Sequence, residues 1–141
     1  MFKTFAHENF GFVLSSLWLF VILNSLFRDM HEMAMASTIT EILAGTMNGA
    51  PVTEGALLAG AVVVQLLLLA MLLSSLLKPA AARRLNLVLP PLMTLAMFLA
   101  PPNDLDDYFF FVVMGGTLLT ITFLAWNWRV PTTAIEPHRA Q

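Results

Sequence analysis

The chain has 141 residues, of which 58% are hydrophobic and 11% are charged, and its mean hydropathy is +0.78. Soluble domains carry about 25% charged residues, so this composition argues against a soluble monomer and against a disordered chain. The net charge of −2 excludes a basic surface for nucleic acid, and the absence of cysteine excludes disulfides and thiolate chemistry. The composition therefore predicts one small domain embedded in a membrane.

Four apolar segments approach or reach the ~20 residues that a helix needs to cross a bilayer. Their approximate bounds are residues 10–28, 55–77, 82–100 and 107–128. The third segment contains Pro90 and Pro91, which favour a kink. The sequence predicts an all-α, transmembrane four-helix bundle over residues 1–129, followed by a flexible cytoplasmic tail over residues 130–141.

The positions of lysine and arginine predict the orientation, because cytoplasmic loops of membrane proteins are enriched in these residues. With four spans, six of the seven basic residues share the side of the two termini, and Arg28 alone lies on the other side. Seven of the nine acidic residues lie on the side of Arg28. Both termini are therefore expected in the cytoplasm. The first apolar stretch exceeds the 7–15 residues of a signal peptide, so it is expected to be an uncleaved anchor.

The connection over residues 30–54 is expected to lie outside the membrane and to contain a short helix. Thr38 and Glu41 match a capping box, which predicts a helix from Ile39 to about Thr46. Polar side chains are also expected to cap or flank the starts of the second and fourth spans. These side chains are Thr53 for the second span, and Asp104, Asp106 and Asp107 for the fourth.

The outer end of the first span is the most polar part of the sequence. Helical spacing places Asn24, Arg28, His31 and Glu32 on one face. Arg28 is expected to pair with Glu32 or with an acidic residue in the 104–107 loop. Two interpretations stay open, a cap whose charges fix the depth of the helix and a site for a polar headgroup or an anionic metabolite. A metal site is disfavoured, because a lone histidine beside carboxylates is a weak metal signal.

Polar residues inside the second and fourth spans predict contacts between helices. Gln65 lies near the middle of the second span, where a polar side chain is expected to face the bundle and hydrogen-bond across it. Thr117 and Thr120 share one face of the fourth span. Gly60 and Gly116 favour close packing of helices within one chain or between chains.

The sequence offers no constellation that would support catalysis. It has no pair of histidines within the spans for haem, no glycine-rich phosphate loop, and no nucleophile grouped with a histidine and an acid. We therefore expect a protein that is not an enzyme and that holds no cofactor and no metal.

Several short motifs of the sequence are Leu17-Trp18 through Leu23-Asn24 with Asp29, Thr53 to Leu58, Met71 to Ser74, and Arg84 with Asn86. Together they resemble the motifs of a family of small bacterial four-helix integral membrane proteins of unknown function. The resemblance spans roughly residues 12–128 and implies a multi-pass protein of the bacterial inner membrane, without an activity. The position of Gln65 is often glutamate in that family and an arginine at Arg28 is not typical, so no ion pathway is carried over.

The functional expectation is a non-catalytic, polytopic membrane protein that associates with itself or with another membrane subunit. Its expected partners are the lipid bilayer and those subunits, and no nucleic acid. The alternative is a small transporter or a lipid- or metabolite-binding protein, with its polar site at the outer end of the first span.

Overall fold

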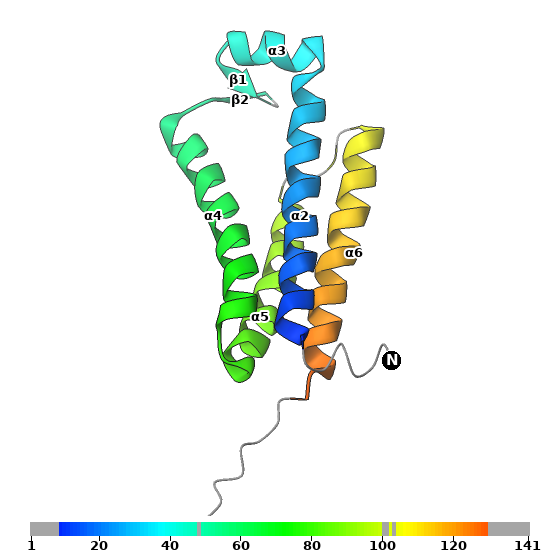
Figure 1. Ribbon diagram of the computed structural model, residues 1–141. Coiled ribbons are helices and arrows are strands. Elements are labelled where there is room, and N and C mark those ends of the chain that lie inside the picture. Colours follow the sequence, from blue (N-terminus) through cyan, green and yellow to red (C-terminus); the bar gives the residue numbers. More distant parts are fainter. Residues whose placement is uncertain (1–8, 48, 100–101, 103, 130–141) are drawn as a thin grey trace, which may run out of the picture.

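The computed structural model describes residues 9–47, 49–99, 102 and 104–129. Four long helices lie side by side and alternate in direction, and a short helix with a two-stranded antiparallel ribbon lies at one end (Figure 1). In chain order the elements are α2 (Phe10–Met33), α3 (Ala36–Leu43), β1 (Thr46–Met47), β2 (Ala50–Pro51), α4 (Glu54–Leu76), α5 (Pro79–Met97) and α6 (Leu105–Asn127). The all-α fold class is therefore confirmed, apart from the small β-ribbon.

Three of the described helices, α2, α4 and α6, are long and apolar enough to cross a membrane. Helix α5 has 19 residues and begins at the charged end of the molecule, with Arg83 and Arg84 in its second turn. It nevertheless packs against α6, α4 and α2 along the same axis. Pro90 and Pro91 lie within α5, which continues through both prolines to Met97.

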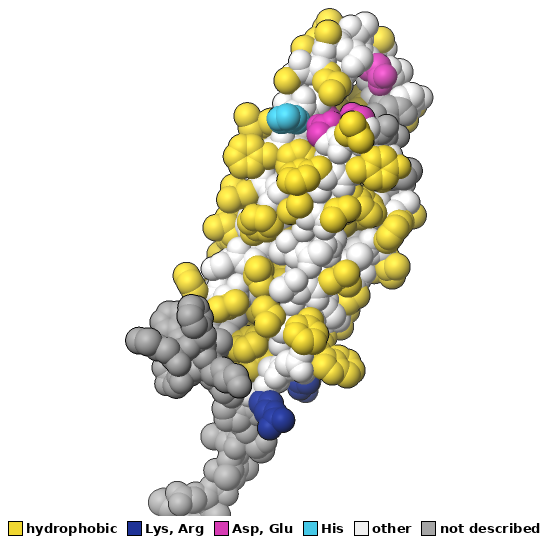
Figure 2. All heavy atoms as spheres, turned by 90° about the vertical axis from the view of Figure 1, so that its right-hand side faces the viewer, with side chains coloured by type: hydrophobic (Ala, Val, Ile, Leu, Met, Phe, Trp, Pro, Cys, Tyr) yellow, Lys and Arg dark blue, Asp and Glu magenta, His cyan; other side chains and the backbone are white. Residues whose placement is uncertain are grey.

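Charged side chains of the described residues separate to opposite ends of the helices, and a broad apolar band lies between them (Figure 2). We call the two groups of side chains the acidic end and the basic end. The acidic end comprises Asp29, Glu32, Glu41, Glu54, Asp104, Asp106 and Asp107, together with Arg28 and His31. The basic end comprises Lys78, Arg83, Arg84 and Arg129.

The packed core occupies the half of the molecule that adjoins the basic end. Its apolar residues come from the first half of α2 and α5 and from the second half of α4 and α6. They include Leu14, Trp18, Leu67, Ala70, Ala82, Leu118 and Ile121. Towards the acidic end, α4 diverges from α2 (Figure 1), and its residues from Glu54 to Leu66 are all exposed.

Two predicted helix starts are confirmed and one is wrong. The hydroxyl of Thr53 accepts a hydrogen bond from the backbone N–H of Ala56 (3.1 Å), and the carboxylate of Asp104 accepts one from that of Asp107 (3.0 Å). Helix α3, however, begins at Ala36 after an N-cap at Met35. Thr38 therefore lies inside α3 rather than capping it, and the capping-box prediction fails.

Candidate functional site at the acidic end

One arginine joins two helices at the acidic end. The Nε of Arg28 on α2 donates to Oδ1 of Asp107 on α6 (2.6 Å), and its Nη2 donates to Oε1 of Glu32 one turn further along α2 (2.9 Å). Asp107 is only 3% exposed, whereas Arg28 and Glu32 are half-buried. Both pairings expected for Arg28 are therefore made at once, and we call these three residues the ion triad.

Local sequence explains why Asp107 faces inward. Asp104 caps the first turn of α6, and the helical spacing of the residues that follow places Asp107 on the same face as the core residues Leu118 and Ile121. Asp106, one position earlier, lies beside His31 at 3.5 Å instead. Asn24, the remaining member of the predicted cluster, donates to the carbonyl of Phe20 in its own helix. The predicted face therefore forms, but Asn24 contributes no contact between helices through that bond.

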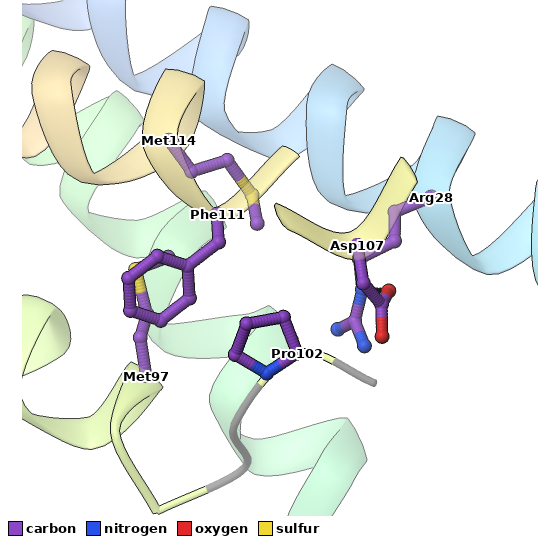
Figure 3. Close-up of a pocket in the computed structure, with 6 residues that line it drawn as sticks. All are labelled: Arg28, Met97, Pro102, Asp107, Phe111 and Met114. Atoms are coloured by element: carbon purple, nitrogen blue, oxygen red, sulfur yellow. Dashed lines mark hydrogen bonds and ion pairs between the residues drawn. The ribbon is translucent and has the colours of Figure 1, made fainter. Parts of the chain in front are cut away.

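A small pocket of about 50 Å³ lies beside the ion triad, between α5 and α6. Arg28 and Asp107 point toward each other on one side of it, and Met97, Phe111 and Met114 form the other side with Pro102 (Figure 3). The side chains of this pocket are apolar except for the ion pair, so the guanidinium and carboxylate satisfy each other in apolar surroundings.

A larger hollow of about 250 Å³ lies deeper, where α4 has diverged from the other three long helices. Arg28 and Ser25 are its polar lining residues, and the others are apolar. The apolar lining includes Val63 and Leu67 from α4, Met93 and Met97 from α5, and Met114 from α6. Such a surface can accept an apolar chain, and the flexible methionine side chains can adapt to its shape. We call it the apolar hollow.

A third hollow of about 160 Å³ lies on the other side of the ion triad, next to α3. Four carboxylates line it, from Glu32, Glu41, Asp104 and Asp107, together with Ser37 and Thr38. We call it the acidic hollow. Among the described residues, no three histidine, aspartate or glutamate side chains are placed to hold a metal ion together. What this arrangement can do is attract a cation at one side of Arg28 and hold an apolar group at the other.

Comparison with protein families matches residues 2–135 to a family of unknown function (DUF6326). The chain belongs to this family. Comparison with curated proteins and with solved structures gives no match. Membership in DUF6326 supplies no activity, so the function of this member has to be inferred from its geometry.

Three residues of this DUF6326 member form a buried polar network that the sequence analysis did not predict. Nε1 of Trp18 donates to Oδ1 of Asn86 (2.7 Å), and Nδ2 of Asn86 donates to Oγ of Ser74 (2.9 Å) and to the carbonyl of Ala82 (2.9 Å). Ser74 in turn donates to the carbonyl of Ala70 (2.6 Å). The network connects α2, α4 and α5 at the basic end. The sequence signal for this network was Asn86 itself, because an asparagine in an apolar segment needs a hydrogen-bond partner when it is buried.

Within the part of the chain that the structure describes, the other polar residues singled out in the spans make no hydrogen bond between helices. Gln65 is exposed on α4 and does not face the bundle as expected. Thr117 and Thr120 donate to the carbonyls of Val113 and Gly116 in their own helix (2.8 Å each). A Cβ added at Gly60 or at Gly116 would meet no atom within 4 Å, so neither glycine supports close helix packing within the chain.

Proposed function

We propose that this protein is a non-catalytic membrane protein of the bacterial inner membrane that associates with a second copy of itself through α4. In this proposal all four long helices cross the bilayer and both termini lie in the cytoplasm. The observation that carries the self-association is Gln65, a polar side chain exposed in the middle of an apolar helix.

The packing of α5 supports the proposal of four crossings rather than three. Because α5 lies alongside three helices that are apolar enough to span, it occupies the same depth as they do. Its 19 residues extend over about 28 Å, close to the ~30 Å hydrocarbon thickness. The basic end supports the proposed cytoplasmic placement of both termini, since cytoplasmic loops are enriched in lysine and arginine.

The position of Gln65 on α4 defines the proposed interface. Two residues correspond to about 200° around a helix, so Gln65 points away from the side on which Leu67 packs into the core. The side of α4 that carries Gln65 also carries four exposed apolar residues, Leu58, Val62, Leu69 and Leu72. This side of α4 would therefore place an amide group among lipid chains, where an unpaired polar group costs several kcal/mol.

A second copy of the chain can supply the hydrogen-bond partners that this amide needs. Two copies inserted in the same direction relate most simply by a two-fold axis along the membrane normal, which places Gln65 opposite Gln65 of the partner. A glutamine amide carries both a donor and an acceptor, so two of them can exchange two hydrogen bonds. The leucine and valine side chains around them supply the packing.

Cysteine crosslinking tests this interface without background, because the chain has no cysteine. We expect Gln65→Cys to form a disulfide-linked dimer in oxidised membranes, whereas Leu67→Cys, on the opposite side of α4, should stay monomeric. In detergent, Gln65→Leu should weaken dimerisation about threefold to tenfold, and Thr120→Leu, a matched exposed position on α6, should not. Equal crosslinking at residues 65 and 67 would refute the proposal.

A further inference from the structure

We infer that the apolar hollow binds the acyl chain of a membrane phospholipid whose headgroup carries an ammonium group, with that headgroup at the ion triad. The inference rests on the proposed placement of the helices in a membrane. It does not depend on the dimer, because the hollow lies on the core side of α4 and Gln65 lies on the opposite side.

The shape and depth of the hollow point to a hydrocarbon chain. It lies within the apolar band, between the packed core and the ion triad, and residues from four helices line it. In a bilayer its apolar walls would be filled by hydrocarbon rather than by water, since an apolar cavity does not hold water. Gly60 lies on the core side of α4, one turn nearer the acidic end than Val63. A Cβ added at Gly60 would meet open space. The space between the helices therefore widens toward the acidic end.

The charges around the hollow select the headgroup. Arg28 borders the apolar hollow, while its two carboxylate partners, Glu32 and Asp107, border the acidic hollow. The ion triad therefore carries one positive and two negative charges, and Glu41 and Asp104 add two further negative charges to the lining of the acidic hollow. An ammonium group is attracted to this lining, and a headgroup with only negative charge is repelled by it.

A zwitterionic headgroup fits both sides of the ion triad. Its phosphate would lie toward Arg28 and Ser25, which are the polar residues of the apolar hollow, and its ammonium would lie toward Glu32. A primary ammonium also donates charge-assisted hydrogen bonds to carboxylates. Phosphatidylethanolamine is therefore the preferred probe, and phosphatidylglycerol with the same acyl chains is the anionic comparison.

Native mass spectrometry of the full-length protein in detergent, titrated with each lipid, tests the inference. We expect the first phosphatidylethanolamine to bind about tenfold more tightly than the first phosphatidylglycerol. Ala96→Phe, at an exposed residue that lines the hollow, should weaken phosphatidylethanolamine binding about tenfold, because its ring displaces roughly two methylene groups of the acyl chain from the hollow. Leu95→Phe, the exposed neighbour outside the lining, should leave it unchanged.

The headgroup contact has its own pair of variants. Glu32→Gln should reduce the preference for phosphatidylethanolamine over phosphatidylglycerol, whereas Glu54→Gln, an acid at the same end that does not line either hollow, should not. Gln65→Leu should retain full lipid preference while it weakens the dimer, which separates this inference from the proposed self-association. Equal affinity for the two lipids, or unchanged binding in Ala96→Phe, would overturn the inference.

Discussion

Replacing Asn86 by leucine should destabilise the protein more than any comparable substitution of an exposed asparagine. Asn86 is 0% exposed and connects Trp18 on α2 with Ser74 on α4. In Asn86→Leu the two side chains lose this common partner. The indole N–H of Trp18 is then left inside the core, whereas Ser74 keeps its hydrogen bond to the carbonyl of Ala70.

The magnitude follows from these contacts. Each hydrogen bond between helices contributes about 0.6 kcal/mol in membrane proteins on average, so the loss of two amounts to roughly 1.2 kcal/mol. An unsatisfied buried N–H adds about 1–3 kcal/mol. We therefore expect the free energy of unfolding to fall by about 2–4 kcal/mol.

Reversible unfolding in mixed detergent micelles with increasing dodecyl sulfate, followed by circular dichroism, measures this change. Asn127→Leu is the matched control, because Asn127 is exposed and donates to the carbonyl of Phe123 in its own helix. Combining Trp18→Phe with Asn86→Leu should cost less than the sum of the two single changes, since the double variant has no orphaned indole. An Asn86→Leu variant no less stable than Asn127→Leu would show that the network at Asn86 contributes nothing to stability.

Three further variants test other contacts by the same unfolding measurement. Arg28→Met should lower stability by about 2 kcal/mol, because it leaves the carboxylate of Asp107 buried without its cation, and adding Asp107→Asn should restore most of the loss; a double variant less stable than the single one would contradict this. Thr53→Ala should lower the free energy of unfolding by about 1 kcal/mol, because α4 loses its cap. Thr120→Ala is the control, since the Thr120 hydroxyl bonds inside α6 and caps no helix. Arg83→Gln should cost about 1–2 kcal/mol, because Arg83 donates to the carbonyls of Ala125 and Trp126 at the end of α6, and an unchanged stability would show that these bonds contribute nothing.

Features set by neighbouring residues could be predicted from the sequence. The caps at Thr53 and Asp104 depend on side chains three residues from their partners, and the pair of Arg28 with Glu32 depends on one helical turn. The bond of Arg28 to Asp107 was one of the stated alternatives because both residues belong to the same predicted end of the helices. The start of α3 was misplaced, since Thr38 and Glu41 form a capping pattern that also fits inside a helix.

Features that depend on how helices face one another could not be predicted. Helix α4 is apolar on all sides, so periodicity gave no indication that Leu67 faces the core and that Gln65 faces outward. The network at Asn86 brings together residues that are 68 and 12 positions apart, and no local pattern relates them. The apolar hollow depends on the divergence of α4, which arises from packing rather than from any motif.

The central claim is that the acidic and basic ends lie on opposite sides of a membrane. Single cysteines at Ser37, near the acidic end, and at Arg84, at the basic end, test it most directly, because the wild-type chain has no cysteine to react. In intact cells, a membrane-impermeant maleimide should label Ser37→Cys, and it should label Arg84→Cys only after the membrane is opened. Labelling of both cysteines from the same side, or recovery of the protein in the soluble fraction, would contradict the account.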